Sequence, residues 1–137
     1  MSNAFRSENV AMTEEYGRRL ASELRGGSVV AFFGGMGMGK TAMVRGIAAG
    51  LGLDAEVSSP TFALVHDYGG HPPLIHFDMY RVSGWDDLYS TGYFDYLDNG
   101  AILVVEWSEN IAAALPADAI RITIHQEDEH VRIIERG

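Results

Sequence analysis

The sequence predicts an α/β fold, in which helices flank a mixed, mostly parallel central sheet. Short apolar runs of strand length alternate with helical patterns along the chain. The run at 101–106 (AILVVE) is apolar without alternation, which is typical of a strand buried on both faces. A glycine-rich stretch follows another such run and precedes a helical pattern. With 137 residues and no linker or repeat, we expect one domain over 1–137, with a loose N-terminus at 1–10.

The first half of the chain is expected to form a helix, a strand and a second helix. Thr13, followed by two glutamates, is typical of a helix N-cap with acids in the first turn. Apolar residues at four-residue spacing then indicate a helix that ends at Gly26-Gly27. Residues 28–33 (SVVAFF) are β-branched and aromatic, as in a buried strand. The segment 40–52 predicts a helix that stops at its closing glycines.

The second half predicts the remaining strands, separated by turns and short helices. Proline and glycine pairs mark the breaks, and the last two strands alternate in polarity as a hairpin does. The expected elements are a strand at 61–65, a turn at 69–73, strands at 74–78 and 101–106, short helices at 85–88 and 93–97, a helix capped by Ser108 that reaches about 115, and a hairpin of strands at 120–125 and 130–135.

Composition excludes several classes of protein. The chain has no cysteine, so it has no disulfide, catalytic thiolate or cysteine-ligated zinc. No apolar run has the length of a membrane span, and no signal core is recognised, so we expect a cytoplasmic protein without a membrane partner. A net charge of −9 and the absence of a basic cluster argue against direct DNA or tRNA binding by this chain alone.

Residues 34–41 (GGMGMGKT) match the phosphate-binding pattern G-x-x-x-x-G-K-[ST], between an expected strand and an expected helix. Glycines let the backbone N–H groups turn inward around an anion, and the following helix adds its N-terminus. Lys40 is expected to reach the β- and γ-phosphates, and the Thr41 hydroxyl to bind Mg²⁺. The pattern therefore predicts a P-loop domain that binds ATP and Mg²⁺.

Two expected strands end in a carboxylate, at Asp78 and Glu106. If both strands run parallel to 28–33, both acids reach the edge of the sheet where the glycine loop lies. They are candidates for holding the metal and for orienting the attacking water. Thr61 follows a proline in an extended segment; it is either a nucleotide-sensing switch or part of an ordinary turn. The five histidines lack metal-ligand spacing, and packing is the expected role of each; only His76 lies within a motif.

Four segments together resemble the TsaE (YjeE) family, the ATPase component of the bacterial machinery that makes N6-threonylcarbamoyladenosine in tRNA. The family patterns are G-[DE]-L-G-A-G-K-T, V-x-S-P-T-[FY]-x-L-V, H-x-D-x-Y-R and [IV]-E-W. In this sequence they read, in the same order, GGMGMGKT (34–41), VSSPTFALV (57–65), HFDMYR (76–81) and VEW (105–107). The likeness extends from about Thr13 to the C-terminus.

The resemblance implies a site and a set of partners. It implies catalysis by Lys40, Asp78 and Glu106, and Mg²⁺ binding by Thr41, Asp78 and Glu106. It implies contacts to the nucleotide by residues of the loop and of the elements around it: Thr13, Gly37, Met38, Gly39, Lys40, Thr41, Ala42, Thr61, Trp107, Glu109 and Arg132, with Thr13 and Arg132 on the adenine side. The partners would be TsaB-like and TsaD-like proteins, which handle the tRNA. The modified position would be position 37 of tRNAs that read ANN codons.

The sequence departs from the family pattern at a few positions, and two other classes of P-loop protein compete. Gly35 replaces an acid, Met36 and Met38 replace Leu and Ala, and Tyr89 stands where many relatives carry another acid. A small-molecule kinase is the main alternative, but 57–80 holds no arginine that could clamp phosphates in a lid. A GTPase would need an Asn-Lys-x-Asp motif, and the only lysine is Lys40.

Overall fold

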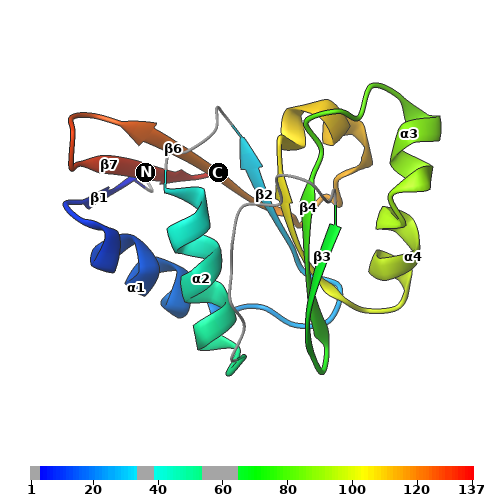
Figure 1. The fold of residues 1–137 in the computed structure, drawn as a ribbon, viewed down its shortest axis with the longest axis horizontal. Coiled ribbons are helices and arrows are strands. Elements are labelled where there is room, and N and C mark those ends of the chain that lie inside the picture. Colours follow the sequence, from blue (N-terminus) through cyan, green and yellow to red (C-terminus); the bar gives the residue numbers. More distant parts are fainter. Residues whose placement is uncertain (1–3, 34–38, 54–64) are drawn as a thin grey trace.

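A seven-stranded mixed sheet forms the centre of the fold (Figure 1). The structure is a computed structural model that describes residues 4–33, 39–53 and 65–137. Its strands and helices follow this order along the chain: β1 (Ala4–Ser7), α1 (Val10–Ala21), β2 (Val29–Phe33), α2 (Lys40–Gly50), β3 (Val65–Gly70), β4 (Pro73–Asp78), α3 (Trp85–Ser90), α4 (Tyr93–Asp98), β5 (Ile102–Glu106), the 3-10 helix η1 (Ser108–Ala114), β6 (Ile120–Gln126) and β7 (Arg132–Arg136).

The strands lie in the order β1-β7-β6-β2-β5-β4-β3. β6, β2, β5 and β4 run parallel to one another and form the middle of the sheet, while β1, β7 and β3 add antiparallel pairs at its two sides. This arrangement confirms the predicted mixed, mostly parallel sheet. It brings the carboxyl ends of β2, β4 and β5 to one edge.

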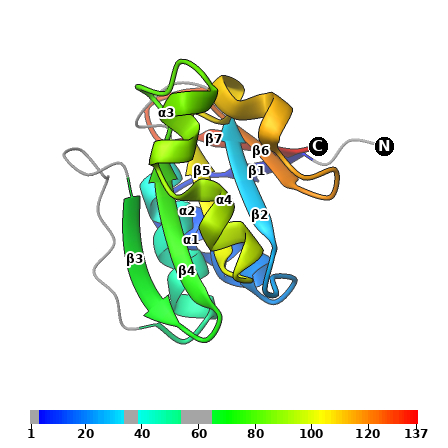
Figure 2. The ribbon, with the colours of Figure 1, turned by 90° about the vertical axis from the view of Figure 1, so that its right-hand side faces the viewer.

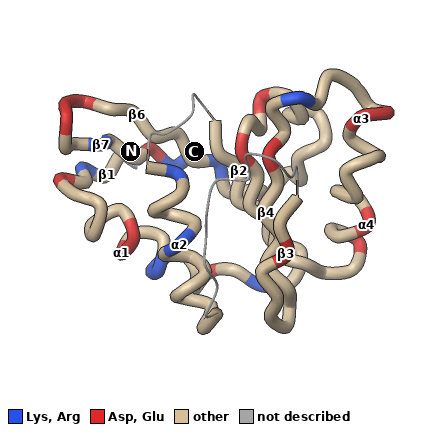
Figure 3. The backbone as a smooth tube through the Cα atoms, viewed as in Figure 1, with Lys and Arg blue, Asp and Glu red and all other residues tan. Residues whose placement is uncertain are grey.

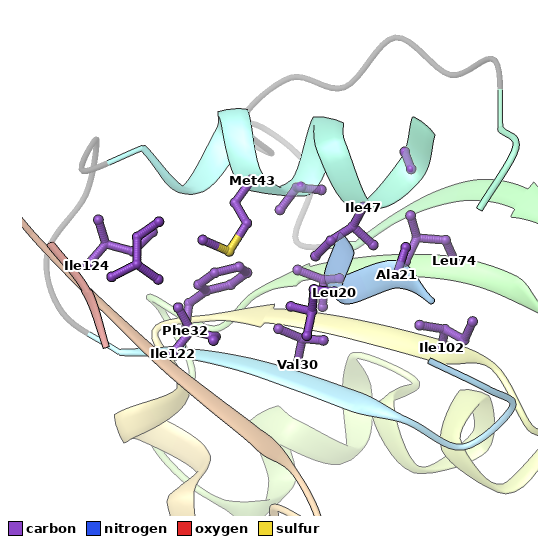
Figure 4. Packing of buried hydrophobic residues seen from close by; sticks show 14 residues of the cluster. Leu20, Ala21, Val30, Phe32, Met43, Ile47, Leu74, Ile102, Ile122 and Ile124 are labelled. Atoms are coloured by element: carbon purple, nitrogen blue, oxygen red, sulfur yellow. The ribbon is translucent and has the colours of Figure 1, made fainter. Parts of the chain in front are cut away.

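The two faces of the sheet are covered by different helices (Figures 1 and 2). On one face, α1 and α2 bury a cluster in which Met43 and Ile47 point toward Phe32 and Val30 of β2 (Figure 4). On the other face, α3, α4 and η1 cover a second cluster that includes Phe77 of β4 and Leu103 and Val105 of β5, while the alternate β5 residues face the first cluster. β5 is therefore buried along its whole length, as its unbroken apolar pattern predicts.

Helices α1 and α2 touch backbone to backbone through two glycines. A Cβ on Gly46 would lie 2.0 Å from the carbonyl oxygen of Glu14, and one on Gly17 would lie 2.2 Å from that of Met43. Only hydrogen fits at either position. The contact fixes α2, and with it the first residue of that helix, against α1.

The N-terminal segment and the first helix differ from the prediction. Residues 1–10 were expected to be loose, but Ala4–Ser7 pair with β7 as β1. Thr13 is not the N-cap: Asn9 caps α1, its side chain accepting from the Met12 amide at 2.9 Å. Asparagine is among the strongest caps, so the helix begins one turn earlier than expected. Thr13 is buried inside it, with its hydroxyl 2.7 Å from that of Ser7.

Two later elements also differ. Of the strand expected at 61–65, only Val65 is described, and it is the first residue of β3; 61–64 lie outside the described residues. The two glycines of the expected turn belong to β3, with φ of 81° and 99°, because a register shift between Asp67 and Gly70 extends the strand to Gly70. The turn itself is at 71–72, inside the predicted span. Ser108 does not cap a helix by its side chain; its hydroxyl donates to the carbonyl of Val105. The remaining predicted helices and strands, including the C-terminal hairpin, are confirmed within a few residues.

Among the residues that the structure describes, no helix is long and apolar enough to cross a membrane.

Candidate nucleotide site

The candidate site lies at the N-terminal end of α2, the helix that follows β2 in the chain. Gly39 precedes the helix with φ of 95°, a left-handed conformation that favours glycine, and Lys40 is the first residue of α2. Within the part of the chain that the structure describes, no side chain caps this end of α2, and the backbone N–H groups of such a helix end can bind an anion. Gly37, Met38 and Thr61, which were also expected at the nucleotide, lie outside the described residues.

Lys40 is a buried cation among acids. Its side chain is only 1% exposed. Burial lowers the pKa of the Lys40 ammonium, while the charges of Glu106, Glu109 and Asp78 act in the opposite direction. Its Nζ also lies 5.9 Å from the centre of the Trp107 ring. A bound polyphosphate would face this ammonium in a poorly hydrated place, where a charge-assisted hydrogen bond is strong.

The two predicted acids are neighbours. β4 and β5 are parallel and in register, so that Asp78 lies directly opposite Glu106. Asp78 accepts a hydrogen bond from the Tyr80 amide at 2.9 Å, and Glu106 is largely buried. The condition that both strands run parallel to β2 is met. The edge of the sheet thus brings two carboxylates toward the lysine.

Trp107 and Glu109 continue the chain past Glu106. Trp107 has φ of 59° and ψ of 42°, a left-handed conformation that costs a non-glycine residue about 1–2 kcal/mol. The Trp107 ring lies near Lys40, and its centre is 5.0 Å from the centre of the Tyr80 ring. Glu109 follows in the first turn of η1 and acts on Lys40 by its charge. Both residues therefore lie near Lys40.

A pocket of about 340 Å³ lies on the other side of Gly39. A Cβ on Gly39 would lie 3.7 Å from the Thr13 methyl carbon Cγ2 and 3.9 Å from Cγ of Arg132, so the three residues converge. Arg132 also donates to the carbonyl of Asp128 at 3.2 Å, which holds its guanidinium beside the β6–β7 turn. The pocket is lined by Asn9, Val10, Thr13, Gly39, Ala42, Glu129, His130 and Arg132. It has the size of a small ligand site.

The donor set fits magnesium held mainly through a nucleotide. In the described parts of the chain, no group of three or more His, Asp or Glu side chains is placed to hold a metal ion. Mg²⁺ is commonly bound by one or two carboxylates together with phosphate oxygens and water. Asp78 and Glu106 supply two carboxylates, and Thr41 is the second residue of α2. The residues present match that mode of binding.

His76, for which packing was the expected role, contacts one of the two predicted acids, and sequence reasoning did not anticipate that contact. His76 is fully buried, and its Nε2 lies 2.7 Å from Oε2 of Glu106. A signal existed. His76 is two residues before Asp78 in a strand, which places both on the same face of the sheet, and the parallel neighbour ends in Glu106. Asn9, Val10, Glu129 and His130 also line the pocket beside Gly39 without having been singled out for it.

Comparison with known proteins identifies relatives of this chain. A family model described as "Threonylcarbamoyl adenosine biosynthesis protein TsaE" matches residues 7–134. A tRNA threonylcarbamoyladenosine biosynthesis protein TsaE from Streptomyces coelicolor is 42% identical over 113 residues, or 80% of this chain and 76% of the relative. The protein of the same name from Treponema pallidum is 35% identical and covers 86% of this chain and 87% of its own.

A solved structure has the same fold. The crystal structure of Bacillus subtilis YdiB superposes with a TM-score of 0.77 at 28% identity, covering 99% of this chain and 84% of that one. The family match covers most of the chain, the identities run above 30% over long alignments, and the fold agrees throughout. This chain therefore belongs to the TsaE family.

Proposed function

We propose that this protein is the ATP-binding and ATP-hydrolysing subunit of the machinery that makes N6-threonylcarbamoyladenosine in tRNA. The pathway follows from the names of its relatives. The chemistry follows from one observation: a buried lysine at the first residue of α2 faces two carboxylates at the ends of parallel strands β4 and β5. That is the constellation with which P-loop proteins bind a nucleotide and its metal.

Each residue has a role in this proposal. Lys40 and the N-terminal amides of α2 bind the phosphates, which the buried ammonium and the open helix end support. Thr41, Asp78 and Glu106 would hold Mg²⁺, which supplies charge neutralisation at the phosphates. The pocket between Thr13 and Arg132 would take the adenine side, and Trp107 would cover the lysine. Gly37, Met38 and Thr61 keep the roles that the family resemblance implies.

The tRNA would be handled by partner proteins rather than by this chain. Along the backbone of the described residues, Lys and Arg (blue) are scattered among Asp and Glu (red) (Figure 3). The net charge of −9 repels a polyanion. TsaB-like and TsaD-like proteins are the proposed partners. The small-molecule kinase alternative is not favoured by the relatives from Treponema pallidum, Streptomyces coelicolor and Bacillus subtilis, which are named for threonylcarbamoyladenosine biosynthesis.

Complementation tests the function directly. A bacterial strain depleted of its own TsaE, and expressing this chain, is expected to regain N6-threonylcarbamoyladenosine in its tRNA, measured by mass spectrometry of digested nucleosides. The Lys40→Ala variant, expressed to the same level by immunoblot, should fail to restore it. Full restoration by that variant would contradict a nucleotide-dependent role, and no restoration by the wild-type chain would contradict the pathway.

A further inference from the structure

A buried hydrogen-bonded contact sets the orientation of Glu106. His76 has no exposed surface, and its Nε2 lies 2.7 Å from Oε2 of Glu106. The two residues come from adjacent parallel strands, so the contact does not depend on a flexible loop. A carboxylate accepts hydrogen bonds and does not donate them, so His76 must carry its proton on Nε2 to make this bond with ionised Glu106.

A tyrosine on the neighbouring strand lies at the other ring nitrogen. The hydroxyl of Tyr68, in β3, is 3.4 Å from Nδ1 of His76 and 3.5 Å from Nδ1 of His66. These contacts are longer than the one to Glu106, and the rings are close, with centres 6.1 Å apart for Tyr68 and His76. A hydroxyl that donates to Nδ1 favours the tautomer with the proton on Nε2. His66 and His76 are register partners, so the edge strand β3 carries this arrangement.

We propose that His76 is a positioning residue for Glu106, with Tyr68 fixing its tautomer. The bond to Oε2 holds the carboxylate in one orientation and leaves Oε1 for the metal or for a metal-bound water. Removing a residue that hydrogen-bonds to a metal ligand commonly lowers metal affinity or activity about 10–100-fold. The inference rests on the proposed function, since it assigns His76 to the same site.

Two amide replacements of His76 separate positioning from packing. The side-chain nitrogen of Gln reaches about as far as Nε2 of histidine, whereas that of Asn reaches only as far as Nδ1. We expect His76→Asn to lower kcat for phosphate release by about 10–100-fold with an unchanged Kd for ATP, and to weaken Mg²⁺ binding by a similar factor. His76→Gln should recover most of both losses. Equal loss in the two variants, at equal thermal stability, would overturn the proposal.

The tautomer of His76 can be measured by NMR in the wild-type protein, without ATP turnover and without a variant at His76. Long-range ¹H–¹⁵N NMR of the nucleotide-free chain should show His76 with its proton on Nε2, and Tyr68→Phe should increase the population of the other tautomer. A proton on Nδ1 in the wild-type protein would overturn the proposal. Absence of ATP hydrolysis by the wild-type chain, even with partner proteins, would refute the proposed function, while the NMR result would still decide the bond to Glu106.

Discussion

At the scale of single residues, Lys40 tests the phosphate site. Replacing it with alanine removes the buried ammonium beside the first turn of α2. Hydrogen bonds to charged groups contribute about 1.5–3 kcal/mol each, so we expect ATP–Mg²⁺ affinity to fall by about 10²-fold or more. Titration calorimetry measures it. Arg45→Ala is the matched control, because Arg45 lies exposed on the same helix in an ion pair with Glu14. Unchanged affinity in Lys40→Ala would refute the phosphate site.

Glu106 tests the metal site at the same scale. Glu106→Gln keeps the shape of the side chain and removes its charge. Nucleotide binding should remain, while hydrolysis should fall by about 10²-fold or more, as expected for a group that positions a metal or a water. A phosphate-release assay and a parallel binding titration measure the two effects. If hydrolysis stays within a few-fold of wild type, Asp78 becomes the better candidate for this role.

At the scale of elements, the α1–α2 contact holds the site in place. Glycine to alanine in a helix is usually stabilising, by about 1 kcal/mol. At Gly46 the new methyl would lie 2.0 Å from the carbonyl oxygen of Glu14, and we expect Gly46→Ala to destabilise the fold by about 1–3 kcal/mol. Denaturant unfolding measures it. Gly84→Ala is the control, with open space around the position and an extended backbone, and should change stability little.

An ion pair links the segment after α1 to β7 and predicts a pH dependence. Arg136 donates two hydrogen bonds of 2.8 Å to Glu23, which hold the pKa of that carboxyl below its ordinary value. Since the folded pKa is lower than the unfolded one, the pair stabilises the fold above about pH 4.3, and this is lost as pH falls through the folded pKa.

The variant Glu23→Gln tests this linkage. The pair is about half exposed, so we expect the variant to lower the free energy of unfolding by about 0.5–1 kcal/mol at pH 7. The difference from wild type should shrink toward zero in acid. Denaturant titrations in steps from pH 7 to pH 3 measure it, and a difference that stays constant over that range would contradict the assignment.

At the scale of the whole molecule, the chain is expected to be a slow ATPase alone. Arg45 is paired with Glu14 and Arg81 is exposed beyond β4, so neither is placed as a transition-state finger. A finger supplied by a partner raises turnover by about 10³–10⁵-fold in other P-loop proteins. We expect a marked rise in steady-state phosphate release with TsaB-like and TsaD-like proteins, and none with tRNA alone. Fast turnover by the isolated chain, unaffected by partners, would favour an autonomous enzyme.

The sequence by itself determined the fold class and the main parts of the site. Unbroken apolar runs predicted buried strands such as β5, and the glycine-lysine pattern predicted that a helix begins at Lys40 after Gly39. The acids at Asp78 and Glu106 were predicted because a strand's end is a local feature, and parallel pairing follows from the α/β class. Each of these signals lies within a few neighbouring residues, so it can be recognised in the sequence without knowledge of long-range contacts.

Only the tertiary structure decided how those parts meet. Thr13 is a residue type that often caps helices, yet the N-cap of α1 is Asn9. The pairing of β1 with β7 brings Ser7 to the Thr13 hydroxyl and places Thr13 inside the helix. The contact of His76 with Glu106, two residues that are 30 positions apart in the chain, depends on the register of strands β4 and β5. The pocket between Thr13 and Arg132 joins opposite ends of the sequence. Such contacts join residues that are far apart in the sequence, so the pattern of neighbouring residues does not predict them.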